Sequence, residues 1–146
     1  MKKQWVAIGL LSAVLIGLVV GFGIFGGDNT VDFQPVTDKN MPRQLEAEIL
    51  PQYRDLERAL ACKVDDRIYV LAMRGEKPTA GYEIQITELK IVTEEGKSRL
   101  VVYADFADPD HPENMARVKS YPVSVVKAEL NGLPDQIELK SSYPKE

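Results

Sequence analysis

Few residues in the chain could take part in catalysis. It has one His (His111) and one Cys (Cys62), in unrelated sequence contexts. Cys62 closes an amphipathic segment and is expected to be buried, whereas His111 stands in a run rich in Asp and Pro. A Cys–His dyad needs an accessible thiolate and a third group that orients the imidazole, and the sequence indicates neither. Motifs of serine hydrolases, zinc proteases, P-loop proteins and dinucleotide-binding enzymes are missing. We therefore expect no catalytic residue and no cofactor.

The acidic segment 105–114 is a candidate cation site. Its oxygen-bearing side chains could suit a hard cation such as Ca²⁺, and they are Asp108, Asp110, Glu113 and Asn114. Their order does not follow the calcium-loop pattern, and Pro109 and Pro112 stiffen the backbone. A solvated acidic loop is the favoured interpretation. One Cys and one His are too few for a structural zinc site, so we predict no metal site.

A short motif between two predicted strands is more informative. Residues 75–82 read Gly-Glu-Lys-Pro-Thr-Ala-Gly-Tyr, which is too long for a tight hairpin. Pro78 fixes φ, and Gly81 can adopt a positive φ just before the next strand. Such a rigid loop loses little entropy on binding. We predict a partner-binding surface formed by Lys77, Pro78, Thr79, Ala80, Gly81 and Tyr82. The alternative is a shaped connection in which Tyr82 anchors the core.

A helical segment over residues 43–62 is predicted to precede the strands. Apolar residues recur there at intervals of three or four, and they are Leu45, Ile49, Tyr53, Leu56 and Leu60. Pro51 fits best in a first helical turn, so the segment forms one helix or two short ones.

Residues 63–146 have the pattern of a β-rich domain. Residues 68–73 form a continuous apolar run typical of a central strand, and three later segments alternate apolar and polar residues. The alternation changes parity near Thr87, which predicts a bulge at Thr87–Glu88. Residues 94–97 predict a hairpin turn, and Ile137 with Leu139 a short last strand. The fold class is α+β, mostly β: a leading helix, then about five mostly antiparallel strands in a small sandwich or open barrel.

The N-terminal residues 1–25 predict a transmembrane anchor. No charge and no Pro occur from Trp5 to Phe25, and this run has the length needed to span a bilayer. A removed signal peptide is the alternative, but no convincing cleavage site follows. Lys2 and Lys3 precede the run, so the N-terminus is predicted to be cytoplasmic and the rest extracytoplasmic. Residues 26–42 are predicted to be a linker. We thus expect a single-pass protein of the cell membrane.

Small residues recur every four positions within this span, at Gly9, Ala13, Gly17 and Gly21. Such a face lets a second helix approach closely, which predicts a homodimer or pairing with another membrane helix. The alternative is the ordinary abundance of Gly and Ala in membrane helices. With Lys2 and Lys3 set aside, the other 16 Lys and Arg face 22 Asp and Glu. This acidic balance argues against a nucleic-acid partner.

The loop at 75–82, the alternating strand after it and the segment Tyr121–Val126 together resemble the C-terminal domain of the PrcB family. The similarity extends from about Tyr69 to Val126. That family is named for a subunit of a secreted bacterial protease complex. The resemblance implies an exported, non-catalytic domain that binds other proteins at the cell envelope, here an accessory subunit of a secreted protease.

The same loop is similar to the Asn-Pro-Thr-Thr-Gly-Tyr loop of chagasin-type inhibitors of papain-like proteases. Pro78, Thr79, Gly81 and Tyr82 match, whereas Lys77 replaces the Asn and the Gly-rich second loop of those inhibitors is missing. A protease inhibitor is therefore an alternative function. An envelope structural or assembly protein without any protease connection is a further one.

Overall fold

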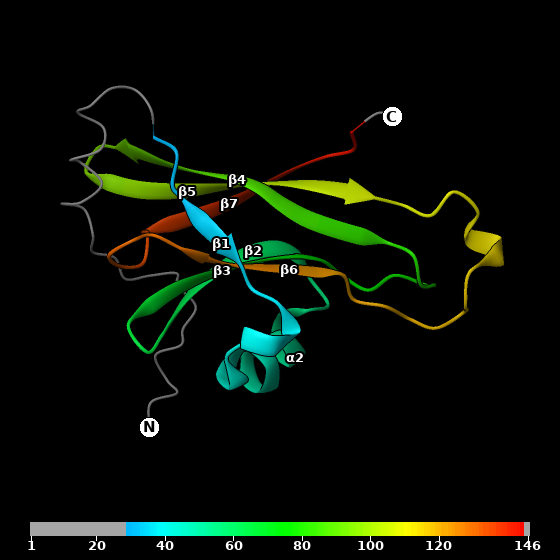
Figure 1. The fold of residues 1–146 in the computed structure, drawn as a ribbon. Coiled ribbons are helices and arrows are strands. Elements are labelled where there is room, and N and C mark those ends of the chain that lie inside the picture. The colour runs from blue at the N-terminus through cyan, green and yellow to red at the C-terminus, as the bar shows by residue number, and fades with distance from the viewer. Residues whose placement is uncertain (1–28, 145–146) are drawn as a thin grey trace.

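The computed structural model describes residues 29–144, which form two packed β-sheets (Figure 1). The four-stranded sheet has the order β1-β6-β3-β2, and the three-stranded sheet has the order β4-β5-β7. The strands are β1 (Phe33–Pro35), β2 (Glu57–Val64), β3 (Arg67–Arg74), β4 (Glu83–Glu94), β5 (Lys97–Ala107), β6 (Val123–Ala128) and β7 (Gln136–Ser142). The prediction of a mostly β sandwich is confirmed.

The main core lies between the two sheets. It includes Val70 and Ala72 from one sheet and Leu89, Leu100 and Val102 from the other, all fully buried. These residues come from alternate positions of their strands because successive side chains point to opposite faces. The period-two alternation seen in the sequence therefore reports the face that each strand turns toward the other sheet.

Strand β3 is apolar on both faces, as its continuous run predicted. Its other set, Tyr69, Leu71 and Met73, is buried in a second cluster on the outer face of the four-stranded sheet. A helical segment covers that face (Figure 1). It consists of the π-helical turn η3 (Leu45–Ile49) and the α-helix α2 (Leu50–Tyr53), while two 3₁₀ turns, η2 (Asp38–Asn40) and η4 (Pro112–Asn114), lie elsewhere.

The prediction of a helical segment through residue 62 is wrong, because residues 57–64 form β2. This strand pairs with β3 along its whole length and joins it through a tight turn at Asp65 and Asp66, both with positive φ. Leu56 and Leu60 are four apart, a spacing that fits one helix turn or two strand repeats equally well. Residues 57–64 form a strand because they pair with the central strand β3.

The predicted linker over residues 26–42 is also wrong for its central part. Val31 is buried, its amide donates to the Leu89 carbonyl, and the Ile91 amide donates to the Asn29 carbonyl. Strand β1 then pairs with β6. A three-residue strand is too short to produce a recognisable period.

Three details of the strand pattern have clear outcomes. The register of β4 against β5 shifts between Ile86 and Glu88, which confirms the predicted bulge. Glu95 and Gly96 have positive φ in the predicted hairpin turn. Strand β7 pairs in parallel with β5, an exception to the antiparallel pairing of the other strands.

The predicted membrane anchor, with Gly9, Ala13, Gly17 and Gly21, lies outside the described residues. Within residues 29–144, no helix is long and apolar enough to cross a membrane.

A candidate protein-binding lobe

Two loops project together from one end of the sandwich and form what we call the lobe, residues 75–82 and 108–121 (Figure 1). The first loop connects β3 to β4, and the second connects β5 to β6. Each loop therefore passes from one sheet to the other. All six residues of the predicted partner-binding surface lie in the first loop.

The two loops are joined mainly through their backbones. The Lys77 amide donates to the Ser120 carbonyl at 2.8 Å, and the Ser120 amide donates to the Lys77 carbonyl at 3.0 Å. The Ala80 amide donates to the Ala116 carbonyl, and the Ser120 hydroxyl donates to the Thr79 carbonyl. Main-chain pairing thus orders the lobe.

Gly81 lies at a close approach of the two loops. Its φ is +101°, which confirms the predicted positive value. A Cβ atom at this position would lie 2.8 Å from Cε of Met115 and 2.9 Å from Cβ of Pro109. Glycine is required here both by the backbone conformation and by the space available.

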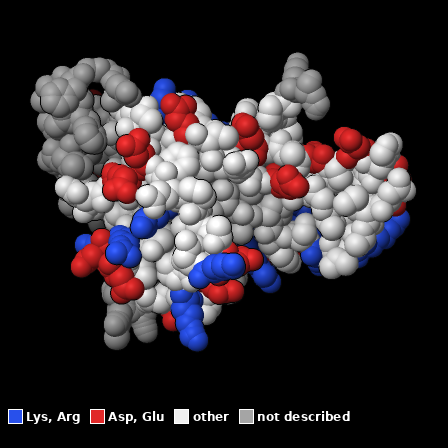
Figure 2. Space-filling model, viewed as in Figure 1, with Lys and Arg blue, Asp and Glu red and all other residues white. Residues whose placement is uncertain are grey.

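The surface of the lobe is divided by charge. Arg117, Val118 and Lys119 are exposed in succession, and Val118 has 60% of its surface accessible. Figure 2 shows basic side chains along the lower margin of the lobe and acidic side chains along its upper margin. Asp110 and Glu113 are exposed on the second loop. An exposed apolar side chain flanked by cations is a suitable anchor for a protein partner.

A polar cluster joins the two loops of the lobe to each other and to the residue that follows α2. The Tyr121 hydroxyl donates to Glu76 at 3.0 Å, and Lys119 lies 3.5 Å from the same carboxylate. This hydrogen bond to Glu76 raises the pKa of the Tyr121 phenol. The guanidinium of Arg54, just after α2, lies 4.2 Å from the centre of the Tyr121 ring.

At the base of the lobe lies a buried cation, Arg74, the last residue of β3. Its Nη2 is 2.8 Å from an Asp108 carboxylate oxygen, and its Nη1 donates to the Glu83 and Ala107 carbonyls. Its guanidinium also lies 4.3 Å from the centre of the Phe106 ring. Arg74 therefore holds together the end of β3, the start of β4 and the end of β5.

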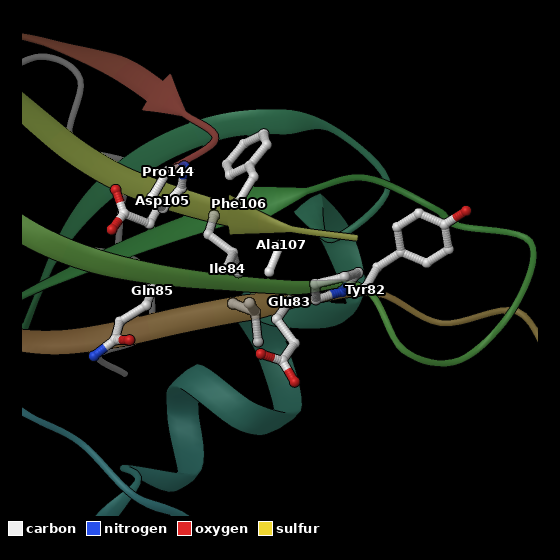
Figure 3. A pocket seen from close by; sticks show the side chains of 10 residues that line it. Tyr82, Glu83, Ile84, Gln85, Asp105, Phe106, Ala107 and Pro144 are labelled. Atoms are coloured by element: carbon white, nitrogen blue, oxygen red, sulfur yellow. The ribbon is translucent and has the colours of Figure 1, made fainter. Parts of the chain in front are cut away.

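The expectation that Tyr82 could anchor the core is wrong. Tyr82 is half-buried, and Figure 3 shows its ring projecting away from the sheet residues around it. The ring lies 5.4 Å from the guanidinium carbon of Arg74 and 5.6 Å from Nζ of Lys77. Tyr82 thus belongs to the surface of the lobe and covers the buried cation.

The sequence interpretation missed Arg74 and the pairing of the second loop with the first. Arg74 had no reliable local signal, because the same strand begins with another Arg, Arg67, which is exposed. The pairing of residues 116–120 with the first loop had no local signal, because it joins segments that are distant in the sequence.

The residues considered for catalysis lie apart. Cys62 is buried in the cluster beneath the helical segment, and burial raises the pKa of its thiol to about 12. His111 is exposed on the lobe, 3.4 Å from Glu113. Asp105 accepts a hydrogen bond from Ser142, and Asp108 pairs with Arg74. Among residues 29–144, no group of His, Cys, Asp or Glu could hold a metal ion.

Comparison with protein families finds a match that includes the lobe. Residues 68–129 match the PrcB C-terminal family. This result confirms the resemblance seen in the sequence. The PrcB C-terminal match includes both loops of the lobe and the strands that carry them, whereas it omits β1, β2, the helical segment and β7. No curated protein and no solved structure matches the chain.

Proposed function

We propose that this protein is a membrane-anchored, extracytoplasmic and non-catalytic protein-binding module. In this proposal it is an accessory subunit of a secreted protease, and the lobe is the surface that contacts the partner. The PrcB C-terminal match supports a protein associated with a protease complex.

The observation that carries the proposal is the construction of the lobe. Its backbone is fastened by hydrogen bonds between the two loops, while Pro78, Arg117, Val118 and Lys119 are exposed. A surface that is already ordered before binding loses less conformational entropy in the complex. An exposed apolar residue on an ordered loop contributes little to the stability of the fold, but it can be buried against a partner.

Affinity capture tests the proposal. The tagged full-length chain is purified from envelope membranes, and its co-purifying proteins are identified by mass spectrometry. The double variant Arg117→Ala with Val118→Ser should lose the partner, whereas its melting temperature stays nearly unchanged, since both residues are exposed and exposed substitutions shift stability by less than about 0.5 kcal/mol. Lys97→Ala, exposed in the β4–β5 hairpin at the opposite end of the sandwich, is the control. Equal capture by all three proteins would exclude the lobe as the contact surface.

The membrane location is tested separately. A reporter enzyme fused after residue 146 should be active only in an extracytoplasmic compartment, and the purified protein should retain residues 1–25. Soluble protein that begins near Ile24 would instead indicate a removed signal peptide.

Protease inhibition is the second candidate, because Pro78, Thr79, Gly81 and Tyr82 lie on the lobe in the order found in chagasin-type inhibitors. Inhibition of papain by the purified chain would favour this function. In our proposal papain activity is unaffected.

A further inference from the structure

A short segment of the second loop is held at both ends and exposed in between. At one end the Ala80 amide donates to the Ala116 carbonyl, and at the other end Lys77 and Ser120 exchange two backbone hydrogen bonds. The three residues between these attachments, 117–119, are all exposed. The lobe therefore presents a stretch of main chain to solvent in a defined position.

Arg117 stands at the tip of a tight turn in this segment. The Val118 amide donates to the Ala116 carbonyl at 2.8 Å, and a bond between residues two apart closes a three-residue turn. In the described part of the chain, neither the backbone nor the guanidinium of Arg117 has a hydrogen-bond or ion-pair partner. The peptide bond from Arg117 to Val118 thus lies between two exposed side chains, one of them an unpaired cation.

Other exposed basic residues lack this combination. Arg67 and Lys97 begin β3 and β5 at the two hairpin turns, so the peptide bonds that follow them belong to paired strands. Lys119 is exposed, but its ammonium lies 3.5 Å from Glu76, and the bond after it leads to Ser120, whose amide is paired. An enzyme that has to draw the main chain into its cleft meets the least resistance at Arg117.

The apolar core does not hold this segment in place. None of residues 116–120 belongs to either cluster of buried apolar residues. A segment with few buried apolar contacts opens locally at a small cost in free energy, without unfolding of the domain. Exposed loop tips of this kind are preferred sites of proteolytic cleavage.

The strands that follow the loop are held independently of it. Strand β6 pairs with β1 and β3, and β7 pairs with β5. Val125, Val126 and Ala128 of β6 are buried in the two apolar clusters. A chain that is cut in the second loop therefore keeps both sheets.

We propose that the peptide bond between Arg117 and Val118 is a processing site for a protease that cleaves after basic residues. Hydrolysis consumes one water, which supplies a hydroxyl group to the Arg117 carbonyl carbon and a hydrogen to the Val118 nitrogen. The products are residues 1–117 with a new carboxylate and residues 118–146 with a new amine. They stay together as a two-chain protein with an intact sandwich. The site goes beyond the proposed function and is tested without the partner.

Limited proteolysis with trypsin tests the proposal. The full-length chain is digested in detergent micelles, and the fragments are identified by mass spectrometry. The first cut within residues 29–144 should follow Arg117, and it should be about tenfold or more faster than cuts after Arg67 or Lys97, since only the lobe opens locally. The two products should co-elute in size-exclusion chromatography and separate only in denaturant.

Variants assign the cut and its mechanism. Arg117→Gln should slow the first cut in the same range about tenfold or more, whereas Arg67→Gln and Lys97→Gln, the matched controls, should leave its rate unchanged. In urea concentrations below the unfolding transition, the rate of the cut after Arg117 should change less than about twofold, because opening of the lobe is local.

A first cut after any other basic residue of that range would overturn the proposal, and so would an unchanged rate in Arg117→Gln. Products that separate without denaturant would show that the halves are not held by the core and would also contradict it. A rate that rises in urea in parallel with the unfolded population would show that the bond is reached only in the unfolded chain, which would exclude a processing site in the folded protein.

Discussion

The sandwich and the lobe are stabilised in different ways. The sandwich has two clusters of buried apolar residues, one between the sheets and one beneath the helical segment. None of the lobe residues 75–82 and 108–121 belongs to either cluster. Hydrogen bonds between two backbones order the lobe, and one buried cation fixes its base. The comparison predicts that exposed side chains on the lobe can change without loss of the fold, whereas the buried side chains of the two apolar clusters cannot.

The largest loss of stability is expected from a substitution in the core of the sandwich. Leu71 is fully buried in the cluster beneath the helical segment. Leu71→Ala should lower the free energy of unfolding by about 2–5 kcal/mol, because it removes buried apolar surface and leaves a cavity. Urea denaturation measures the change. Leu56→Ala is the control, since Leu56 is 44% exposed and should shift stability by less than about 0.5 kcal/mol.

The second-largest loss of stability is expected at Arg74, where the base of the lobe meets the sandwich. Arg74→Met keeps much of the apolar contact but removes a charged donor from two carbonyls, so we expect a loss of about 2–3 kcal/mol. The half-exposed Asp108 can be hydrated, which limits the cost. Arg99→Met is the matched control, because Arg99 forms more exposed ion pairs with Glu94 and Glu138. A loss for Arg74→Met no greater than for Arg99→Met would show that the cation does not fix the lobe.

The contact between the two loops should have a smaller effect. Gly81→Ala should cost about 1–2 kcal/mol, because the new methyl group meets Met115 and Pro109 in a strained backbone conformation. Gly96 also has a positive φ but no atom within 4 Å of an added Cβ. The excess cost of Gly81→Ala over Gly96→Ala, measured by thermal unfolding, reports the contact between the loops. Equal costs would leave backbone strain as the whole effect.

The buried thiol of the sandwich should give the smallest effect, visible only at alkaline pH. The pKa of Cys62 is raised from 9.0 to about 12 by burial. Below pH 9 both the folded and the unfolded chain keep the proton, so the thiol causes no change. Above pH 9 the unfolded chain releases it first, and the free energy of unfolding should fall by about 1 kcal/mol between pH 9 and pH 10. Cys62→Ala should show a shallower decline, measured by urea denaturation at each pH, and parallel declines would contradict the prediction.

The local pattern of the sequence predicted those features that are set within one strand or between two consecutive strands. The bulge near Thr87 and the turn at Gly96 follow from a change of parity and from a glycine between two alternating runs. Strand β2 was missed because Leu56 and Leu60 fit both periods. The parallel pairing of β7 and the contact of Lys77 with Ser120 join segments far apart in the chain. Such pairings are set by tertiary packing, which no local period records.

Strand β7 has a consequence for the order of folding. It pairs with β5 along Arg99–Asp105, and among the described strands it is the last to be synthesised. Until it is released, β5 has an unpaired edge beside Leu100 and Val102, residues of the main core. An apolar strand with an open edge recruits strands from other chains. Synthesis of β7 is therefore the step that protects the nascent chain from aggregation, and truncation before Gln136 should produce insoluble protein.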